Sequence, residues 1–493
     1  MMNNNMLLLI PILLPIICGL AAGLFGKLRV RARYKGMAIV AMLAVEAIAS
    51  ILCLRIGMSL VVGSINEAIR IVFRVDALSR MFGALVVFVW FLTGIYACEY
   101  LKKDKHFDSF FAFYLMTEGM IMALAEAGNM ITFYMFFEMM TMLSFPMVMH
   151  DRTHEAIRAG LKYMFYSVAG ALMSLFAIFM LTPYGYLGDF KAGGILDIEA
   201  LTGHEQVLLI SALMMIVGLG TKAGMFPMHA WLPTAHPEAP APASAVLSGV
   251  ITKTGVIGII RGVYYCIGSR LLAGTWVQHT WLVLSLITVL MGSMLAYREP
   301  VLKKRLAYST VSQVSYMMFG LAIMNSVAFT GAVSHIVFHS LIKTTLFLVA
   351  GAVIHQTGHT RVEELRAIGK EMPVTMCSYT IVSLGLIGIP PLSGFVSKWY
   401  LASGALMSGT SPYSWLGPVI LLISALLTAG YLLPVTVRGF FPGVNYGVGT
   451  PNRAEPDVIM YVPMIVMSVM TLILGIYPGL ITTTIQNIAA GIF

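Results

Sequence analysis

Long apolar segments recur along the whole chain, and this pattern decides what the chain can fold into. Many segments have about 18 or more mostly apolar residues, enough for a helix to cross the ~30 Å hydrocarbon core of a bilayer. Charged residues make up only 11% of the chain, against about a quarter in soluble domains. We therefore predict an all-α polytopic membrane protein.

About fourteen transmembrane helices are predicted from the apolar segments. They centre near residues 16, 50, 88, 118, 139, 170, 216, 254, 289, 315, 342, 388, 427 and 471. A β-barrel is disfavoured because its ~10-residue spanning segments alternate apolar and polar side chains, and runs such as LITVLMGSMLAY do not alternate. No predicted loop exceeds roughly 25 residues, so residues 1–493 are expected to form one membrane domain.

Lysine and arginine gather in alternate loops, and this predicts the orientation of the chain. The basic loops are residues 27–35, 102–105, 152–162, 298–305, 361–370 and 438–453. Basic loops stay on the cytoplasmic side, so both termini are expected on the outer face of the cell (inner) membrane. The net charge of +9 is then a topology signal and does not indicate nucleic-acid binding. The first apolar run has no basic segment before it, which favours a retained helix over a signal peptide.

The cysteines and glycines give no sign of a cofactor. The five cysteines are scattered and form no CxxC motif or Cys/His cluster, so no metal, iron–sulfur cluster or disulfide framework is expected. Glycine-rich phosphate loops and nucleotide fingerprints are also missing. We expect the chain to bind no cofactor and to carry no redox centre or ATP chemistry of its own.

Five charged residues lie inside the predicted spans. They are Glu138, Lys222, Lys253, Lys343 and Lys398. A charge at membrane depth costs at least ~2.5 kcal/mol, and such residues usually mark ion or proton pathways. Their number predicts a protein that moves ions.

Two of the spans contain helix breakers. One has Gly218, Gly220, Gly224 and Pro227 around Lys222; the other has Gly388, Pro390, Pro391 and Gly394 before Lys398. Interrupted hydrophobic segments in corresponding halves are typical of transporters with inverted repeats. We place the repeats at residues 109–267 and 280–441, with N-terminal helices over 1–108 and a C-terminal helix over 455–493.

Lys222 and Glu138 are predicted to act together. Burial disfavours an ammonium and a nearby carboxylate favours it, so a changing distance between the two side chains is a usable proton switch. A static ion pair that fixes helix packing is the alternative. Lys253 is flanked by Thr252 and Thr254 and is expected at mid-span, where reaching an interface would be strained.

His335, His339 and Lys343 follow one another at i, i+4 and i+8. This spacing places them on one helix face, and histidine titrates nearest to neutral pH, so the stripe suits a water-bridged proton wire. A haem site, a metal site or packing histidines are alternatives, although haem or metal would need ligands from another helix.

The remaining polar residues are less specific. Lys398 is either a terminal proton-loading site or an interfacial anchor beside Trp399 and Tyr400. His229 and His236 follow the first break and either extend a path or cap helices. A further group is expected to make interfacial or lateral contacts and receives no role: Glu46, Glu118 and Glu126.

Over roughly residues 73–441 the chain resembles the antiporter-like, proton-translocating membrane subunits. That superfamily includes the large pump subunits of complex I, the large subunits of Mrp antiporters and the pump subunits of membrane-bound hydrogenases. The motifs that carry the resemblance are FRVDALS, MFFEMMTMLS, KAGMFPMHAWLPTAHPEAPAPASAVLSGVITKTGVIGIIR, KKRLAYSTVSQVSYMMFGL, HSLIKTTLFLVAGAVIH and GIPPLSGFVSKW.

The resemblance implies fourteen helices with two inverted five-helix repeats, each containing a broken helix. Glu138 resembles the family's mobile glutamate, Lys222 its partner lysine, and Lys253 the central lysine of the next helix. The connecting His/Lys helix is matched by His335, His339 and Lys343. Lys398 matches the terminal charged position, where some relatives have glutamate.

The function implied is that of a proton-translocating subunit, with sodium as an alternative cation. It would belong to a multisubunit complex I-related oxidoreductase, of the hydrogenase type as judged from LPTAHPEAPAPASAVLSG and the absence of a long lateral helix. Its partners would be other membrane and peripheral subunits and the lipid bilayer, without nucleic acid. Two alternatives stay open: a large Mrp antiporter subunit without a redox partner, and a decayed membrane anchor.

Overall fold

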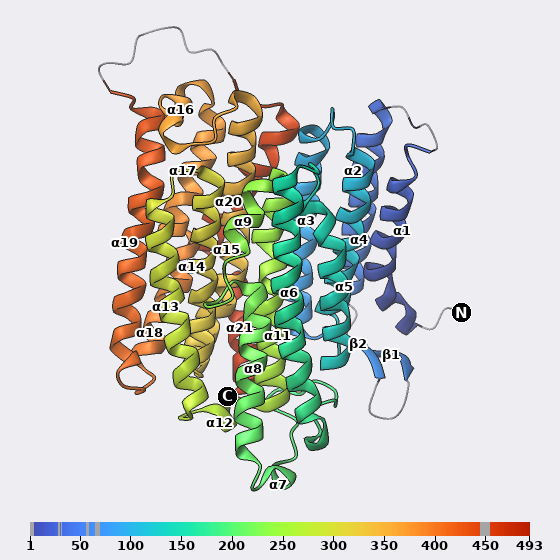
Figure 1. The fold of residues 1–493 in the computed structure, drawn as a ribbon, viewed down its shortest axis with the longest axis vertical. Coiled ribbons are helices and arrows are strands. Elements are labelled where there is room, and N and C mark those ends of the chain that lie inside the picture. Colours follow the sequence, from blue (N-terminus) through green and yellow to red (C-terminus); the bar gives the residue numbers. More distant parts are fainter. Residues whose placement is uncertain (1–3, 28–29, 31, 56–58, 65–69, 444–453) are drawn as a thin grey trace.

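The structure is a computed structural model that describes residues 4–27, 30, 32–55, 59–64, 70–443 and 454–493. Its helices lie side by side along one direction (Figure 1). The first elements are the 3-10 helix η1 (Asn4–Leu9), the helices α1 (Ile10–Gly23) and α2 (Ala32–Leu54), the antiparallel strands β1 (Ser59–Ser64) and β2 (Arg70–Arg74), and α3 (Ala77–Tyr100). The strand hairpin was not predicted from the sequence.

The middle of the chain contains the first broken helix. Its elements are α4 (Phe107–Ala125), α5 (Met130–Val148), α6 (His154–Leu181), η2 (Thr182–Tyr184), α7 (Ile198–Leu201), α8 (Glu205–Ala223), α9 (Leu232–Glu238), α10 (Ala241–Val246), the π-helix η3 (Leu247–Ile251), α11 (Thr252–Ile259), the π-helix η4 (Ile260–Ile267) and α12 (Ser269–Leu272).

The last part contains the second broken helix. Its elements are α13 (Trp276–Arg298), α14 (Leu302–Ala322), α15 (Ser326–Thr357), η5 (Val362–Leu365), α16 (Ile368–Glu371), α17 (Pro373–Ile387), α18 (Ser393–Leu406), α19 (Tyr413–Phe440), α20 (Val458–Ile476) and α21 (Gly479–Ile492).

Twelve helical segments among the described residues are long and apolar enough to cross a membrane. The prediction of an all-α multi-pass membrane protein is therefore confirmed. The hydroxyl-rich helix α14 and the broken pair α17–α18 are not among these twelve segments. The count of fourteen, the inverted repeats and their limits stay predictions.

Both predicted helix breaks are present. Helix α8 ends at Ala223, and Gly224 follows with a left-handed φ of 77°; helix α17 ends at Ile387, and Gly388 follows with φ of 94°. Glycine adopts this conformation without the steric penalty of a side chain, and it commonly ends helices in this way. The two breaks therefore have the same local cause.

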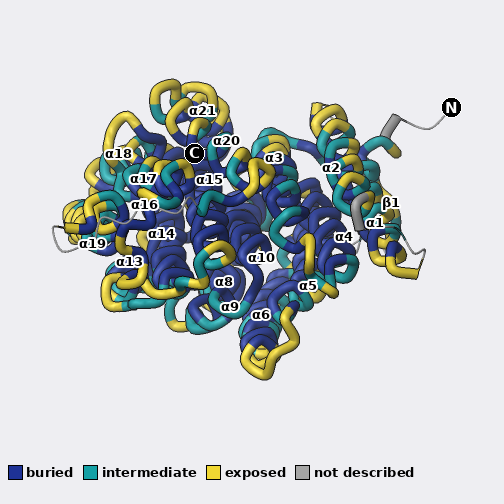
Figure 2. Tube along the Cα trace, turned by 90° about the horizontal axis from the view of Figure 1, so that it is seen from above, coloured by how far each residue is buried: buried dark blue, intermediate teal, exposed yellow. Residues whose placement is uncertain are grey.

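The core of the protein lies around α15 and the segment from α10 to η4. The most apolar stretch of each is entirely buried. Helices α3, α14, α17, α18 and α20 pack around α15. In Figure 2 these buried elements occupy the middle, and exposed residues form the rim. Charged residues on α15 and α11 are therefore shielded from lipid by protein.

A buried ion pair joins the start of α3 to the π-helical segment η4. Arg261 is 2% exposed and forms two hydrogen bonds with the Asp76 carboxylate, at 2.5 and 2.9 Å. Asp76 also caps α3 by accepting a hydrogen bond from the backbone N–H of Ser79. The pair connects two segments that are far apart in sequence, and this fixes the packing of α3 against the core.

Three glutamates that were expected to make interfacial or lateral contacts are buried. Glu46 is 1%, Glu118 3% and Glu126 0% exposed. Helix α1 packs against both α2 and α4 and contributes to the burial of Glu46 and Glu118. This burial argues against the interfacial alternative, and lateral contacts stay a prediction.

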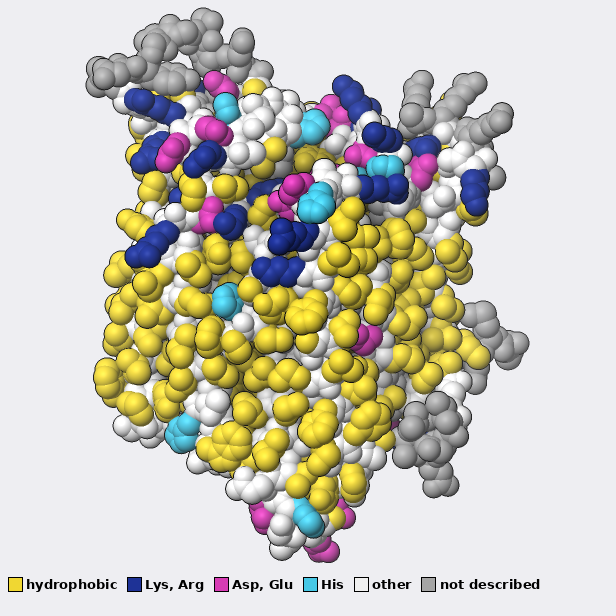
Figure 3. Space-filling model, in the orientation of Figure 1, with side chains coloured by type: hydrophobic (Ala, Val, Ile, Leu, Met, Phe, Trp, Pro, Cys, Tyr) yellow, Lys and Arg dark blue, Asp and Glu magenta, His cyan; other side chains and the backbone are white. Residues whose placement is uncertain are grey.

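Basic side chains gather at the upper end of the molecule, above a broad apolar belt (Figure 3). The bridge between Val301 and Arg361 joins two of the predicted basic loops directly. Parts of two other basic loops, residues 28–29, 31 and 444–453, lie outside the described residues.

Candidate functional site

Lys222 lies in the last turn of α8, and three hydroxyl groups surround its ammonium. Nζ donates hydrogen bonds to Thr141 of α5 at 2.8 Å and to Tyr163 of α6 at 2.7 Å. A longer bond of 3.3 Å goes to Ser167, and Nζ lies 4.4 Å from the centre of the Tyr163 ring. The side chain is 1% exposed, so neutral oxygens and an aromatic face stabilise a buried cation here.

Glu138 lies near this cluster on α5 but does not pair with the lysine. Among the described residues, no ion pair within 4.0 Å joins Glu138 to Lys222. Oε1 of Glu138 is buried and has no hydrogen-bond partner. Thr141, three residues later on the same face of α5, accepts the lysine's hydrogen bond instead. The ammonium of Lys222 is therefore hydrogen-bonded to a neutral hydroxyl, and the carboxylate of Glu138 lies one turn of α5 away from that hydroxyl.

Lys253 lies in the buried segment where π-helix η3 meets α11. Its Nζ donates to the backbone carbonyl of Ser248, and at 3.3 Å to the Thr252 hydroxyl. The Ser248 hydroxyl lies 2.8 Å from Thr310 of α14. The sequence predicted a regular helix here; the π-helical turn, common at functional sites, was not foreseen.

His335 and His339 lie one turn apart on α15, as the spacing predicted. Their rings stack with centroids 5.5 Å apart. Nδ1 of His335 is 2.8 Å from the Ser397 hydroxyl of α18, and its ring also stacks on Tyr316 of α14 at 5.8 Å. Both ring nitrogens of His339 are buried without a hydrogen-bond partner.

Lys343 continues the same face of α15 and is held by α14. Nζ donates to the Ser309 hydroxyl at 2.6 Å and to the carbonyl oxygen of Leu306 at 3.0 Å. The hydroxyl of Tyr431, on α19, donates to Ser309 at 2.7 Å. Lys343 is fully buried, and its surroundings are again neutral oxygens.

Lys398 lies on α18 and points back to the end of α17. Nζ donates to the carbonyl oxygens of Leu386 and Ile387 at 2.7 and 2.9 Å. It also lies 5.1 Å from the centre of the Tyr316 ring. The neighbouring Trp399 is 62% exposed, so the tryptophan faces outward while the ammonium faces the helix break.

The two histidines after the first break differ in depth. His229 is partly exposed, stacks on Phe226 with centroids 5.9 Å apart, and has a buried Nδ1 without a partner. His236 is fully buried and stacks on Phe347 of α15 at 4.7 Å. Neither of its ring nitrogens has a partner. His236 therefore lies against the helix that carries the His/Lys stripe.

The sequence interpretation predicted a span at helix α14 but gave no role to its polar residues. The Ser309 hydroxyl accepts a hydrogen bond from Lys343, and the Tyr316 ring contacts both His335 and Lys398. The Thr310 hydroxyl hydrogen-bonds to Ser248, whose carbonyl oxygen accepts from Lys253. One helix thus reaches four of the predicted positions. The available signal was the run STVSQVSY, whose hydroxyl and amide groups are unusual for an apolar span.

Several buried polar atoms around these residues have no partner. In addition to His339, they belong to Gln313 of α14 and to Ser334 and Thr344 of α15. Buried polar groups are nearly always hydrogen-bonded, to protein or to ordered water. The charged residues therefore lie in a polar interior that suits water molecules as bridges.

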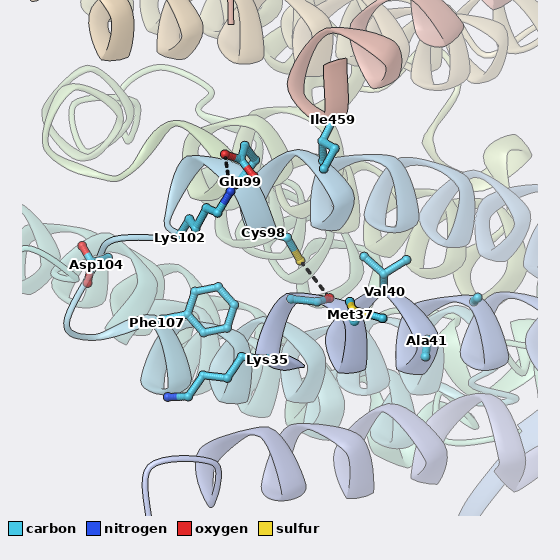
Figure 4. A pocket seen from close by; sticks show the side chains of 12 residues that line it. Lys35, Met37, Val40, Ala41, Cys98, Glu99, Lys102, Asp104, Phe107 and Ile459 are labelled. Carbon is cyan, nitrogen blue, oxygen red and sulfur yellow. Dashed lines mark hydrogen bonds and ion pairs between the residues drawn. The ribbon is translucent and has the colours of Figure 1, made fainter. Parts of the chain in front are cut away.

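Two of the cavities lined by described residues lie at the basic end of the molecule. One of about 850 Å³, lined mainly by α2 and α3 with Lys35, Cys98 and Ile459, is remote from the lysine series (Figure 4). The other, of about 500 Å³, is more polar and is lined by Glu238 and Lys303 among others. Burial raises the pKa of Glu238 above its ordinary value, although Lys303 opposes the shift.

Comparison with known proteins identifies the family of the chain. Residues 127–428 match the family described as NADH:quinone oxidoreductase/Mrp antiporter, TM, and residues 60–111 match the N-terminal family of complex I chain 5. A subunit N of NADH-quinone oxidoreductase from Desulforudis audaxviator is 30% identical over 418 residues, which cover 82% of this chain and 81% of the relative.

Two other matches extend the comparison. Hydrogenase-4 component B of Escherichia coli is 29% identical over 440 residues, and the match covers 84% of this chain but only 64% of that protein. A chain of an archaeal membrane-bound sulfane sulfur reductase superposes with a TM-score of 0.84 at 20% identity, over 98% of this chain and 96% of that one. The family match covers residues 127–428, and the relative from Desulforudis audaxviator is matched over 81% of its length. The chain therefore belongs to the NADH:quinone oxidoreductase/Mrp antiporter membrane family.

Proposed function

We propose that this chain is the ion-translocating, antiporter-like subunit of a multisubunit membrane complex related to complex I, of the hydrogenase type. The single observation that carries the proposal is the series of buried cationic side chains held by neutral oxygens. A purely structural cation is normally paired with an acid. Four lysines without an acidic partner among the described residues indicate groups that exchange protons.

The series defines a path across the middle of the protein. It starts at Glu138 and Lys222, passes Lys253, His339 and Lys343, and ends at Lys398. Helix α14 provides hydroxyl groups or an aromatic ring beside the last three lysines. Water at the unpartnered atoms of His339 and Gln313 would complete the hydrogen-bonded chain.

Glu138 and Lys222 supply the switch in this path. With hydroxyl partners only, a buried ammonium is disfavoured and tends to release its proton; beside a carboxylate, it is favoured. A rotamer change that brings Lys222 from Thr141 to Glu138 would alternate these two states. Energy from redox chemistry in partner subunits would drive the alternation, since no redox centre is expected in this chain.

The basic end of the molecule is proposed to face the cytoplasm of a cell membrane. Short basic loops remain on that side, and basic side chains gather at this end in Figure 3. The C-terminus lies toward the opposite end in Figure 1, which supports the expected outer position of that terminus.

An Mrp-type antiporter subunit is the second candidate. The observation that favours it is the family match itself, whose description names both kinds of protein. The two candidates differ in their partners: iron–sulfur and nickel-binding subunits indicate the first, small antiporter subunits the second. Purification of the complex from its native membrane and identification of its subunits by mass spectrometry decides between them.

The test of translocation uses the intact complex in proteoliposomes. Lys222→Ala and Glu138→Gln should abolish proton or sodium movement while the subunit stays assembled, because each removes one partner of the switch. Lys191→Ala is the matched control, since Lys191 is exposed and lies outside the series. Normal translocation by both site variants would overturn the proposal; loss in the control would show that the assay reports general damage.

A further inference from the structure

Three potential metal ligands meet at the basic end, outside the membrane-spanning helices. Asp104 lies in the loop between α3 and α4, and His150 and Asp151 lie in the loop between α5 and α6. One ligand atom from each lies within 4.8 Å of the other two. The three residues come from two loops that are brought together only by the packing of the helices.

His150 is the unusual member of this group. Its side chain is 4% exposed, and its Nε2 lies 3.3 Å from Oδ1 of Asp104. Despite this short distance, Nε2 has no hydrogen-bond partner. The ring is fixed by edge contacts with Phe110, at 5.3 Å, and with His106, at 6.1 Å. A buried imidazole nitrogen is therefore held in place, unsatisfied, and directed at a carboxylate.

We propose that Asp104, His150 and Asp151 bind a divalent transition-metal ion, with Zn²⁺ as the best fit. Imidazole nitrogen and carboxylate oxygen are both ligand types that zinc accepts, at about 2.0–2.2 Å from the metal, and three such ligands leave a fourth position open. Ligand atoms around a tetrahedral ion lie about 3.4 Å apart; His150 and Asp104 are already at 3.3 Å, and the atom of Asp151 has to approach by no more than about 1.4 Å. Asp151 is exposed and free to rotate for this purpose.

The ligand set argues against the alkaline-earth cations. Ca²⁺ and Mg²⁺ prefer oxygen ligands only, and Mg²⁺ keeps most of its waters. Imidazole nitrogen favours zinc and its neighbours in the transition series. A site for these metals also differs from the earlier expectation, based on cysteine patterns, that the chain has no metal site.

The position of the site suggests what the metal does. Asp104 and Asp151 also line the polar cavity of about 500 Å³, together with Glu238, Lys303 and His355. Lys303 donates to the carbonyl oxygen of Ala239 at 2.6 Å, three residues after the buried His236. A bound metal would neutralise two acids of this cavity and tie its two loops together. If the cavity is an entrance to the proposed path, zinc should inhibit translocation; this consequence rests on the proposed function, whereas metal binding does not.

Metal binding is measured on the purified complex without any transport assay. After removal of metal with a chelator, Zn²⁺ is titrated against a chromophoric competitor, and wild type is compared with His150→Ala and Asp151→Asn. We expect one equivalent fewer, or affinity at least about tenfold weaker, in both variants. His154→Ala is the matched control, because His154 is exposed nearby and outside the group, and it should bind like wild type.

Two outcomes would overturn the site. Equal stoichiometry and affinity in wild type and in the Asp151→Asn variant would do so, and this variant changes only an exposed side chain, so its folding is not in question. Equal loss in His154→Ala would show that binding is not confined to the group. In proteoliposomes, Zn²⁺ should slow translocation by wild type more than by Asp151→Asn; a bound metal without inhibition would leave the site intact and remove its link to the path.

Discussion

The two broken helices carry their lysines in opposite ways. At the first break Lys222 precedes the interruption and donates to side-chain hydroxyls of α5 and α6. At the second break Lys398 follows the interruption and donates to two backbone carbonyls in the last turn of α17. The first lysine is thus bound to neighbouring helices, and the second is bound to the broken helix itself.

This difference suggests different secondary roles for two residues of the same proposed path. The last carbonyls of a helix have no intrahelical partners and carry partial negative charge, so a cation there stabilises the helix end. Lys398 therefore caps α17 as well as carrying charge. Lys222 has no such duty, since its Nζ donates to side-chain hydroxyls of α5 and α6 and to no carbonyl of α8. Lys222 is therefore freer than Lys398 to change its hydrogen-bond partner.

The largest expected effect is on translocation and is shared by both breaks. Lys222→Met and Lys398→Met each remove an ionisable group from the series, so we expect ion movement by the intact complex to be lost in Lys222→Met and to fall at least about tenfold in Lys398→Met. Proton or sodium uptake into proteoliposomes measures it. If only Lys398→Met keeps normal uptake, the path ends before Lys398, and this residue serves only as a helix cap.

The next expected effect is a difference in the free energy of unfolding between the variants at the two breaks. Lys398→Met leaves two carbonyls of α17 without their donor, and we expect a loss of about 1–2 kcal/mol in stability. Lys222→Met replaces a buried cation by an apolar side chain of similar length, which is often neutral or stabilising. Thermal unfolding of the two purified variants compares them. A lower Tm for Lys222→Met than for Lys398→Met would contradict the assignment of the cap to the second break.

A smaller effect concerns the tyrosines beside the two lysines. Tyr163 contacts Lys222 through its hydroxyl, whereas Tyr316 contacts Lys398 through its ring and donates its hydroxyl to Leu421 instead. A hydrogen bond to a charged group is worth about 1.5 kcal/mol or more, so Tyr163→Phe should slow translocation about tenfold. Tyr316→Phe keeps the ring and should change it less than about twofold. Equal effects of the two changes would show that the breaks do not differ in this way.

The smallest effect is expected at Ser167. Its hydrogen bond to Lys222 is the longest of the three, at 3.3 Å, and two shorter bonds remain when it is lost. Ser167→Ala should reduce translocation by no more than about twofold, and Thr141→Val by more, because Thr141 lies at 2.8 Å. The reverse order would mean that the lysine moves away from Thr141 in the working state.

Local signals in the sequence were sufficient for some of this site. Glycine and proline gave the two breaks, because their backbone preferences act on the residue itself. The i, i+4 spacing placed His335 beside His339, since helix geometry fixes neighbours on one face. Fold class followed from the apolar segments alone.

Contacts between helices were not predictable in the same way. Whether Lys222 meets Glu138 or Thr141 depends on the rotation of α8 against α5, and no pattern within one helix encodes that angle. The hydroxyls of α14 were overlooked because serine and threonine in spans are common and bond to their own helix. The burial of Glu46 was not predicted, because cover by α1 and α4 depends on which helices become neighbours.

The measurement closest to the central claim is ion translocation by the intact complex with Lys222→Met, run beside Lys191→Met under the same driving reaction. The series of buried lysines predicts that Lys191→Met pumps like wild type, and that Lys222→Met assembles and sustains the driving reaction of its partners but moves no ions. Normal pumping by Lys222→Met would contradict the account.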